Sequence, residues 1–471
     1  MLCVDGVEIS TTGGHYIGLG MAPAPYRLAG EPRDVVEDVA RLGGFGIVAH
    51  PGSPKPDLRW REWAAAFDAL EWLNADSEWR DEPPLAFARL ILQYPFRPSE
   101  TLASLLDRPD AVLDRWDALT RRRRIVGLAG TDAHARIGGR EFTDPDESPA
   151  GLRLPSYEAL FKAFSIRVRP GRPWTGQAGP DASDLLRAIR SGHLHSSIDA
   201  LARSRGFSFT AASGRSFATE GDDLAVEGPV RLRVLADTPS DASIALFRNG
   251  RVVQTVQGGE LAFTDSGAGL VFRAEVHLNR APGRPPVPWI VSNPIYLRRP
   301  GASAELPLTR TQPRAKIPAD IAGMHIEHDS SSAATITRRD RGLVPGLNVS
   351  YRLGGGARAG QFAAAVLPID FRTAQFDRLS FEGRADRPTR VSIQVRLDGA
   401  GERWQRSIYL DGTTGPISVF FSDMTPVGRV AMSASRPPMD RVQSLLLVID
   451  TNNTLPGRSG TIDIADLRFE R

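Results

Sequence analysis

The chain has 471 residues, of which 41% are hydrophobic and 24% charged, so the sequence predicts about three globular domains and argues against a disordered protein. Its single cysteine, Cys3, excludes a disulfide framework and a zinc site built from thiolates. The 58 basic and 55 acidic residues nearly balance and the arginines are scattered, so we expect no nucleic-acid partner. We also expect no membrane span, because every apolar run is shorter than roughly 18 residues, and no signal peptide in this chain.

Short apolar strands alternate with amphipathic helices over residues 1–168. This alternation is typical of an α/β layer or barrel, in which functional groups lie at the strand ends. The expected strands are 4–9, 16–20, 45–49 and 125–129, and the expected helices are 32–42, 59–67, 84–92 and 98–119.

The pattern changes after the first domain. Residues 169–206 form a linker rich in proline and glycine, with a short helix expected at 181–190. Apolar residues then alternate with a period of two over residues 207–299, which predicts a β-sandwich. A second linker over 300–318 leads to residues 319–471, where the same alternation predicts a second, independent sandwich. The expected fold class is therefore multidomain, α/β plus all-β.

Histidine and carboxylate side chains lie at or near the ends of predicted strands in the first domain. Asp132 and His134 are two residues apart on an extended segment, so both side chains can face one centre. Each candidate alone has an ordinary structural explanation, such as a turn at a His-Pro pair. Their conjunction along one domain predicts a site for Zn, Mn or Fe, which suit imidazole and carboxylate ligands. The candidate ligands are Glu8, His15, His50, Asp132 and His134.

Three segments carry a family resemblance: Gly-x-Glu at 6–8, Ala-His-Pro at 49–51 and Asp-x-His at 132–134. With them, residues 4–135 resemble the later two-thirds of a PHP domain, the polymerase and histidinol phosphatase superfamily of metal-dependent hydrolases. The closest branch is the CehA/McbA type, related to carbaryl hydrolase. The resemblance implies a distorted β/α barrel that holds two or three divalent ions in its full-length form. It assigns all five candidates above as ligands and places Glu71 and Asn74 at the rim of the site.

The family's opening His-x-His and Thr-Asp-His motifs have no counterpart before Gly6. We therefore expect that the reading frame starts late and that the chain as given binds metal weakly or is inactive. His193 and His195 supply a later His-x-His, but this motif follows a predicted helix and enters the first sandwich, so strand or turn residues are the expected interpretation.

The resemblance implies that a metal-bound hydroxide hydrolyses a small phosphoester, carbamate or other ester. Glu8 and Asp132 would be the catalytic residues, with Asp132 as ligand and general base. The alternative is a non-catalytic glycan- or protein-binding protein that carries a remnant of the PHP domain. Serine hydrolysis lacks its Gly-x-Ser-x-Gly elbow here, and no phosphate-binding loop ending in Gly-Lys-Ser/Thr occurs.

The two sandwiches have weaker resemblances. The Trp-Ile-x-Ser-Asn-Pro-Ile-Tyr segment at 289–296 is similar to the end of the immunoglobulin-like domain that follows the PHP domain in this branch. Residues 319–471 resemble galactose-binding-like or carbohydrate-binding sandwiches. The candidate glycan contacts are Trp404, Tyr409 and Asn452, although burial of both aromatic rings in the core is the favoured interpretation. Because the branch is often exported, we expect an extracytoplasmic bacterial protein, periplasmic or secreted, in which residues 319–471 are separable from catalysis.

Overall fold

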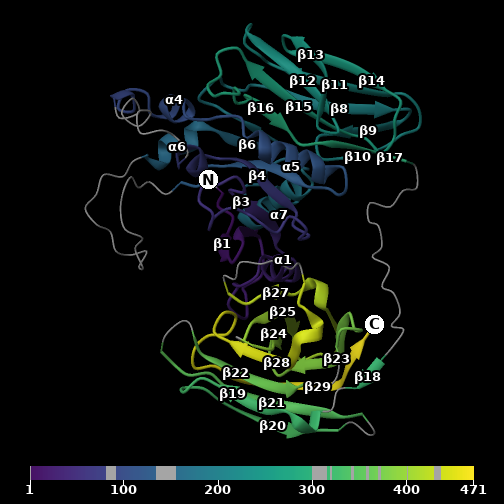
Figure 1. Ribbon diagram of the computed structural model, residues 1–471. Coiled ribbons are helices and arrows are strands. Elements are labelled where there is room, and N and C mark those ends of the chain that lie inside the picture. Colours follow the sequence, from purple (N-terminus) through teal and green to yellow (C-terminus); the bar gives the residue numbers. More distant parts are fainter. Residues whose placement is uncertain are drawn as a thin grey trace. The chain divides into compact units, whose positions relative to one another are not determined.

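The structure of this chain is a computed structural model, shown in Figure 1. It describes residues 2–80, 92–133, 155–299, 316–318, 321–340, 344–356, 360–369, 373–399, 401–428 and 436–471. The chain forms two compact units. The N-terminal unit comprises Met1–Ala22 and Val36–Leu306, and the C-terminal unit comprises Pro23–Val35 and Pro307–Arg471. Among the described residues, no helix is both long enough and apolar enough to span a membrane.

The N-terminal unit begins with a five-stranded sheet in the order β1-β2-β3-β4-β5. The first three strands pair antiparallel, and β3-β4 and β4-β5 pair parallel. Every residue of β3 and β4 is buried, as is typical of central strands covered on both faces. The described residues show an open sheet and not the closed barrel that the family resemblance implies. The strands are β1 (Gly6–Thr11), β2 (Gly14–Leu19), β3 (Phe45–Ala49), β4 (Ala69–Asn74) and β5 (Val126–Gly130).

The helix expected at 32–42 is confirmed as Pro32–Arg41, whereas the single helix expected at 98–119 is two helices, Pro98–Ala103 and Asp110–Thr120. The helix expected at 59–67 is wrong, because these residues form turns in which Trp60 and Phe67 are buried and contact each other edge to face. Their apolar spacing reflects a buried loop and not one face of a helix. The helix expected at 84–92 lies almost entirely outside the described residues. The described helices are α1 (Pro32–Arg41), α2 (Ala75–Arg80), α4 (Pro98–Ala103), α5 (Asp110–Thr120), α6 (Tyr157–Ala163) and α7 (Ala178–Arg190).

A β-sandwich completes the N-terminal unit, as the alternation over 207–299 predicts. Its four-stranded sheet has the order β14-β11-β8-β9, and its eight-stranded sheet contains β6, β7, β10, β12, β13, β15, β16 and β17. The strand β7 comes from residues 169–206, which the sequence suggests are a linker, and β6 comes from the end of the expected first domain. The strands are β6 (Ser165–Val168), β7 (Leu194–Ser197), β8 (Phe207–Ser213), β9 (Ser216–Thr219), β10 (Asp223–Ala225), β11 (Val230–Ala236), β12 (Ala242–Arg248), β13 (Arg251–Gln257), β14 (Glu260–Asp265), β15 (Val271–Leu278), β16 (Ile290–Ser292) and β17 (Ile295–Arg298).

The C-terminal unit contains the second expected sandwich. One sheet has the order β20-β21-β29-β23-β26 with β18 beside β29, and the other has the order β19-β22-β28-β24-β25-β27. Apolar residues of both sheets form a continuous core between them. The strands are β18 (Lys316–Pro318), β19 (His325–His328), β20 (Ala333–Arg338), β21 (Gly346–Arg352), β22 (Phe362–Pro368), β23 (Arg378–Ala385), β24 (Thr389–Leu397), β25 (Arg403–Leu410), β26 (Gly415–Phe420), β27 (Thr425–Pro426), β28 (Val442–Asp450) and β29 (Ser459–Glu470).

Candidate metal centre

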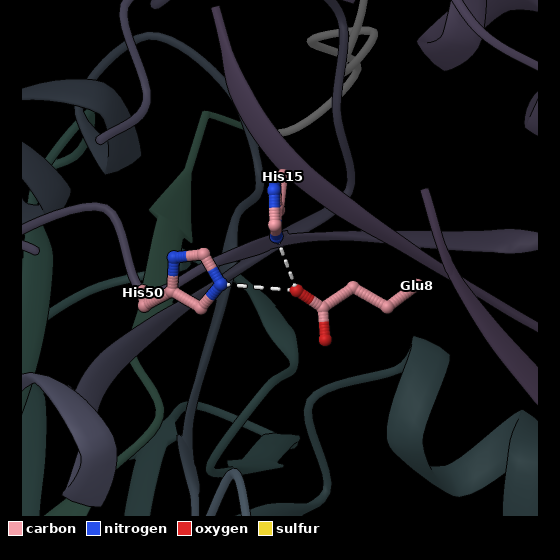
Figure 2. A group of neighbouring side chains, drawn as sticks. All are labelled: Glu8, His15 and His50. Atoms are coloured by element: carbon pink, nitrogen blue, oxygen red, sulfur yellow. Dashed lines mark hydrogen bonds and ion pairs between the residues drawn. The ribbon is translucent and has the colours of Figure 1, made fainter. Parts of the chain in front are cut away.

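Three of the five candidate ligands lie together at one end of the first sheet (Figure 2). Their ligand atoms all lie within 4.8 Å of one another. Glu8 Oε1 is 2.7 Å from His15 Nδ1 and 3.0 Å from His50 Nε2. The two imidazole rings are 5.0 Å apart and meet edge to face at 64°. One carboxylate oxygen therefore serves two histidines.

Strand pairing explains this convergence. Side chains of Glu8 and Ser10 face the same side of β1, and Ser10 pairs with His15 on β2. His15 in turn pairs with Ala49, the last residue of β3, and His50 follows directly. His50 has a φ of 31°, a left-handed backbone conformation that side chains other than glycine rarely adopt and that is common at functional sites. The register of β1, β2 and β3 thus brings one side chain from each strand or its end into the cluster.

Electrostatics couple the three groups. Hydrogen bonds from His15 and His50 outweigh the effect of burial and lower the pKa of Glu8 to about 2. Burial disfavours the charged form of His50, but the hydrogen bond to Glu8 and its negative charge outweigh burial and raise the pKa of His50. The side chain of Glu8 is 37% exposed, whereas that of His50 is 4% exposed. The cluster therefore opens to solvent on the side of β1.

A second group of polar residues lies behind His50. Glu71 Oε2 accepts the backbone N–H of His50 at 2.8 Å and the side-chain amide of Asn74 at 2.8 Å. Burial raises the pKa of Glu71 to about 7. A Cβ on Gly130 would lie only 1.7 Å from Glu71 Oε1, so this position at the end of β5 has no room for a side chain. Glu71 supports the backbone that carries His50.

The remaining predicted ligands are placed differently. Asp132 does not join the group of three among the described residues, but its Oδ2 lies 3.4 Å from Asn74 Nδ2 and its φ is 43°. His134 lies outside the described residues. His193 pairs with Asp222 at 2.7 Å, and His195, on β7, pairs with Glu220 at 3.3 Å. The expected strand position is confirmed for His195, and His193 directly precedes the same strand.

The donor set fits a divalent ion. One carboxylate and two imidazoles suit zinc, manganese or iron, and three protein ligands leave positions open for water or substrate, as catalytic zinc sites do. The Nδ1 atom of His50 is buried and has no hydrogen-bond partner among the described residues. It is the ring nitrogen opposite Nε2, and because Nε2 is the one that faces Glu8, the chemistry of the donor set and not this atom argues for an ion at the cluster.

The candidate glycan contacts in the C-terminal unit do not form a common platform. Trp404 is 2% exposed, because its side chain faces the core between the two sheets, and it is therefore not a glycan contact. The ring of Tyr409 contacts the ring of Tyr26 with centroids 6.0 Å apart. Asn452 is exposed and donates to Asp450 at 3.1 Å. The interpretation favoured from the sequence is that both aromatic rings are buried in the core. Of the two, only Trp404 is buried.

Sequence reasoning missed a polar row on β24 and β25. Gln394 Nε2 donates to Ser392 Oγ at 3.1 Å, and Ser392 Oγ donates to Gln405 Oε1 at 3.1 Å. Arg403 lies 3.3 Å from Gln394 Oε1, and Arg396 forms two bonds to Glu327, at 2.9 and 2.6 Å. The signal was present in the sequence, because every second residue from 390 to 396 is polar while the alternate ones enter the core.

Comparisons with known proteins give little further information. No protein-family model matches the chain, and no curated protein matches it. Among solved structures, a family 11 carbohydrate-binding module of the cellulosomal cellulase Lic26A-Cel5E of Clostridium thermocellum is 16% identical with a TM-score of 0.26, covering 33% of this chain and 94% of that chain. An exo-β-agarase is 11% identical with a TM-score of 0.23, and the match covers 32% of this chain and 24% of that chain. A family 29 carbohydrate-binding module is 13% identical with a TM-score of 0.19, and the match covers 31% of this chain and 92% of that chain. Likenesses at this level establish neither the fold nor the function of this chain.

Proposed function

We propose that the N-terminal unit is a metal-dependent hydrolase that acts on a small phosphoester, carbamate or other ester. The convergence of Glu8, His15 and His50 carries this proposal, because three strands bring their ligand atoms within 4.8 Å. Chance proximity of three such groups is common on acidic surfaces, but here one of the three is buried and held by a carboxylate behind it. The bond to Glu71 fixes the backbone at His50 and so restricts where its imidazole can lie.

Each residue of the site has a role in the proposed reaction that follows from its position. Glu8, His15 and His50 would hold the ion, and Glu71 would fix the backbone of His50. A divalent ion at this place supplies Lewis acidity toward an ester oxygen and lowers the pKa of water. Asp132, which is half-buried and lies beside Asn74, is the carboxylate that we assign to accept a proton from the attacking water. Solvent access on the side of β1 admits the substrate.

Metal binding tests the proposal directly. We expect the full chain to bind Zn²⁺ or Mn²⁺ weakly, measured by titration calorimetry. His50→Ala and Glu8→Gln should each weaken binding by about tenfold or more, because each removes a ligand. His193→Ala is the matched control, since His193 also pairs with a carboxylate at 2.7 Å but lies outside the cluster. Equal metal binding by all four proteins would contradict the site.

Turnover tests the chemistry. Hydrolysis of p-nitrophenyl phosphate and p-nitrophenyl acetate should require added metal, stop on chelation, and be lost in His50→Ala and Asp132→Asn but not in His193→Ala. A chain that binds metal at the cluster but hydrolyses neither ester would limit the proposal to metal binding.

A second candidate function is glycan binding by the C-terminal unit. The half-buried members of the polar row on β24 and β25, Ser392, Gln405 and Arg403, support it, because hydroxyl, amide and guanidinium groups side by side suit the hydroxyls of a sugar. Gln394 is 3% exposed and is not counted among the glycan contacts. Two of the similar solved structures are carbohydrate-binding modules, but the proposal does not rest on them. A mixed-linked β-glucan oligosaccharide should then bind the full chain and bind Gln405→Ala and Arg403→Ala less well. Arg384→Ala, on the other sheet, is the control, and equal binding by all variants would exclude this row as the glycan site.

A further inference from the structure

Strand β5 is an edge strand of the first sheet. Its one strand partner is β4, so the other edge of β5 presents backbone N–H and C=O groups that no strand of the described sheet pairs. Buried backbone groups of this kind need partners. The side chains that provide them come from the end of the first sandwich, more than 160 residues along the chain.

Asn293 acts on this edge as a strand would. Its Oδ1 accepts the backbone N–H of Gly127 at 2.8 Å, and its Nδ2 donates to the carbonyl oxygen of the same residue at 2.9 Å. The second proton of Nδ2 goes to the carbonyl of Leu194 on β7, at 3.0 Å. Asn293 is 1% exposed. A carboxamide is suited to this task because it has a donor and an acceptor side by side, which aspartate and leucine lack.

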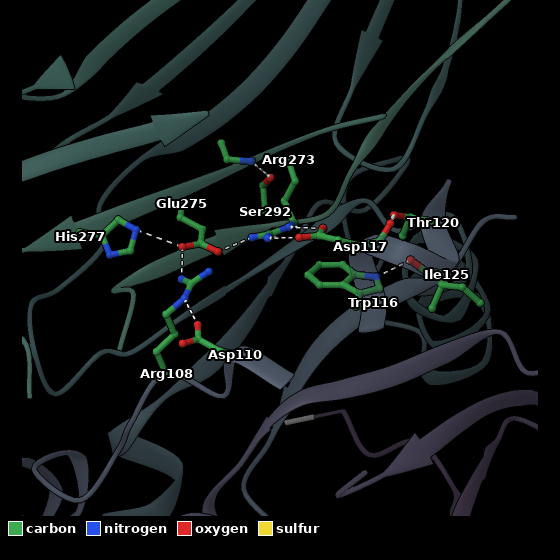
Figure 3. A network of polar contacts seen from close by, with 11 residues as sticks. Arg108, Asp110, Trp116, Asp117, Thr120, Ile125, Arg273, Glu275, His277 and Ser292 are labelled. Atoms are coloured by element: carbon green, nitrogen blue, oxygen red, sulfur yellow. Dashed lines mark hydrogen bonds and ion pairs between the residues drawn. The ribbon is translucent and has the colours of Figure 1, made fainter. Parts of the chain in front are cut away.

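Two aromatic side chains bind the backbone of Ile125, the residue directly before β5. The hydroxyl of Tyr296 lies 3.2 Å from the backbone nitrogen of Ile125 and accepts its proton. Trp116 on α5 donates its indole N–H to the carbonyl of Ile125 at 3.0 Å (Figure 3). A Cβ on Gly127 would lie 2.3 Å from the ring of Trp116, so the strand lies flat against this ring. The position of β5 is therefore fixed from both sides.

The contacts that hold β5 in place also affect the metal centre, because β5 packs against Glu71. Gly130, at the C-terminal end of β5, lies directly against the Glu71 carboxylate, which accepts the backbone N–H of His50 at 2.8 Å. A shift of β5 along its edge would move Gly130 against or away from Glu71. Glu71 and His50 would then move together, because the space around the carboxylate is filled.

We propose that Asn293 is a positioning residue: it holds β5 in register from the sandwich side, so that Glu71 and His50 keep the geometry of the metal cluster. For its functional meaning the inference rests on the proposed metal site. The sandwich is then part of the active unit and not an appended domain, since its Ser-Asn-Pro-Ile-Tyr segment at 292–296 supplies the clamp.

The test compares Asn293→Ala with Ser292→Ala. Ser292 is its neighbour, is equally buried, and accepts the backbone N–H of Ala274 at 2.9 Å within the sandwich (Figure 3). Zn²⁺ affinity should fall about tenfold in Asn293→Ala and stay unchanged in Ser292→Ala. Tyr296→Phe, which keeps the packing and loses the hydroxyl bond, should reduce the affinity less and takes the place of Asn293→Ala if that variant does not fold. Equal losses of affinity in Asn293→Ala and Ser292→Ala would overturn the inference, because general destabilisation would then explain them.

Amide hydrogen exchange separates this inference from the proposed function. Exchange at β5 and at the His50 amide should be faster in Asn293→Ala than in the unaltered chain and unchanged in Ser292→Ala, with no metal present. If the unaltered chain binds no Zn²⁺, the proposed function fails, and faster exchange at His50 in Asn293→Ala alone still supports the positioning role. Unchanged exchange at His50 overturns it, whatever the metal binding.

Discussion

Glu8 illustrates how much a single residue contributes to the cluster. Its pKa falls from 4.5 to about 2, so its stabilising effect is complete above pH 4.5 and is lost as the pH falls toward 2. The pKa of His50 rises above 6.5, so its effect is complete below pH 6.5 and is lost as the pH rises through the new value. Between pH 4.5 and 6.5 both groups stabilise the folded chain.

Glu8→Gln should therefore be most destabilising between pH 4.5 and 6.5 in the metal-free protein. We expect a cost on the order of 0.5 kcal/mol, because Glu8 is more than one-third exposed and solvent screens the pair. Urea unfolding at several pH values measures it. The imidazole of His50, followed by NMR, should also titrate at lower pH in this variant. Glu158→Gln, which removes a carboxylate that pairs with Lys162, should leave His50 unchanged. A constant His50 titration in Glu8→Gln would contradict the coupling.

A buried network of charges joins helix α5 to strand β15 (Figure 3). Arg273 donates from Nε and Nη2 to the two oxygens of Asp117, at 3.0 and 2.7 Å. Glu275 accepts from Arg273 and Arg108 and lies 3.0 Å from His277 Nε2. Burial opposes the ionised form of Glu275, but the positive charge of Arg273 outweighs it and holds the pKa of Glu275 well below its usual range. Each charge is paired, as burial requires.

Removal of one partner from this network should be costly. Asp117→Asn leaves the buried Arg273 with less than its full countercharge, so we expect the free energy of unfolding to fall by about 3 kcal/mol. Asp110→Asn removes the partner of Arg108 that is 52% exposed, and it should cost less than about 1 kcal/mol. Denaturant unfolding of both variants measures the difference. Similar costs would show that the network does not stabilise the junction between α5 and β15.

At the scale of the whole molecule, the two units are interleaved in sequence. The chain leaves the N-terminal unit after Ala22, contributes Pro23–Val35 to the C-terminal unit, and returns at Val36. Within the C-terminal unit, Asp34 is 2% exposed and pairs with Arg390 and Arg406. Asn453 donates to the carbonyl of Ala29 at 2.9 Å. The expectation that residues 319–471 are separable from catalysis stays a prediction, but these contacts imply that their removal would affect Pro23–Val35.

Removal of residues 319–471 should expose the segment Pro23–Val35. It would lose the guanidinium partners of Asp34 and the backbone contacts around Ala29, so trypsin should cut after Arg27 and Arg33 much faster in the shortened chain than in the full one. Mass spectrometry of timed digests measures this. Metal binding should persist before cleavage, because the three clustered ligands precede residue 51. Equal resistance of both chains at Arg27 would show that the C-terminal unit does not protect the segment.

The sequence alone determined the features that depend on local pattern. Alternating apolar residues predicted both sandwiches, and buried runs predicted the strands before His50 and Asp132. The polar residues at the ends of these strands indicated the candidate ligands, three of which the structure brings together. Periodicity is reliable in these cases because burial of one strand face leaves a repeat in the sequence. It failed at 59–67, where a buried loop gives helix-like apolar spacing.

Only the tertiary structure decided how distant residues meet. The register of three strands brings Glu8, His15 and His50 together, and the packing of Gly130 places Glu71 behind His50. The contact between Arg390 and Asp34 joins residues 356 positions apart, and the bond from Asn293 to Gly127 spans 166. Such pairs leave no repeat or spacing in the sequence, because each side is compatible with many partners until the fold fixes one.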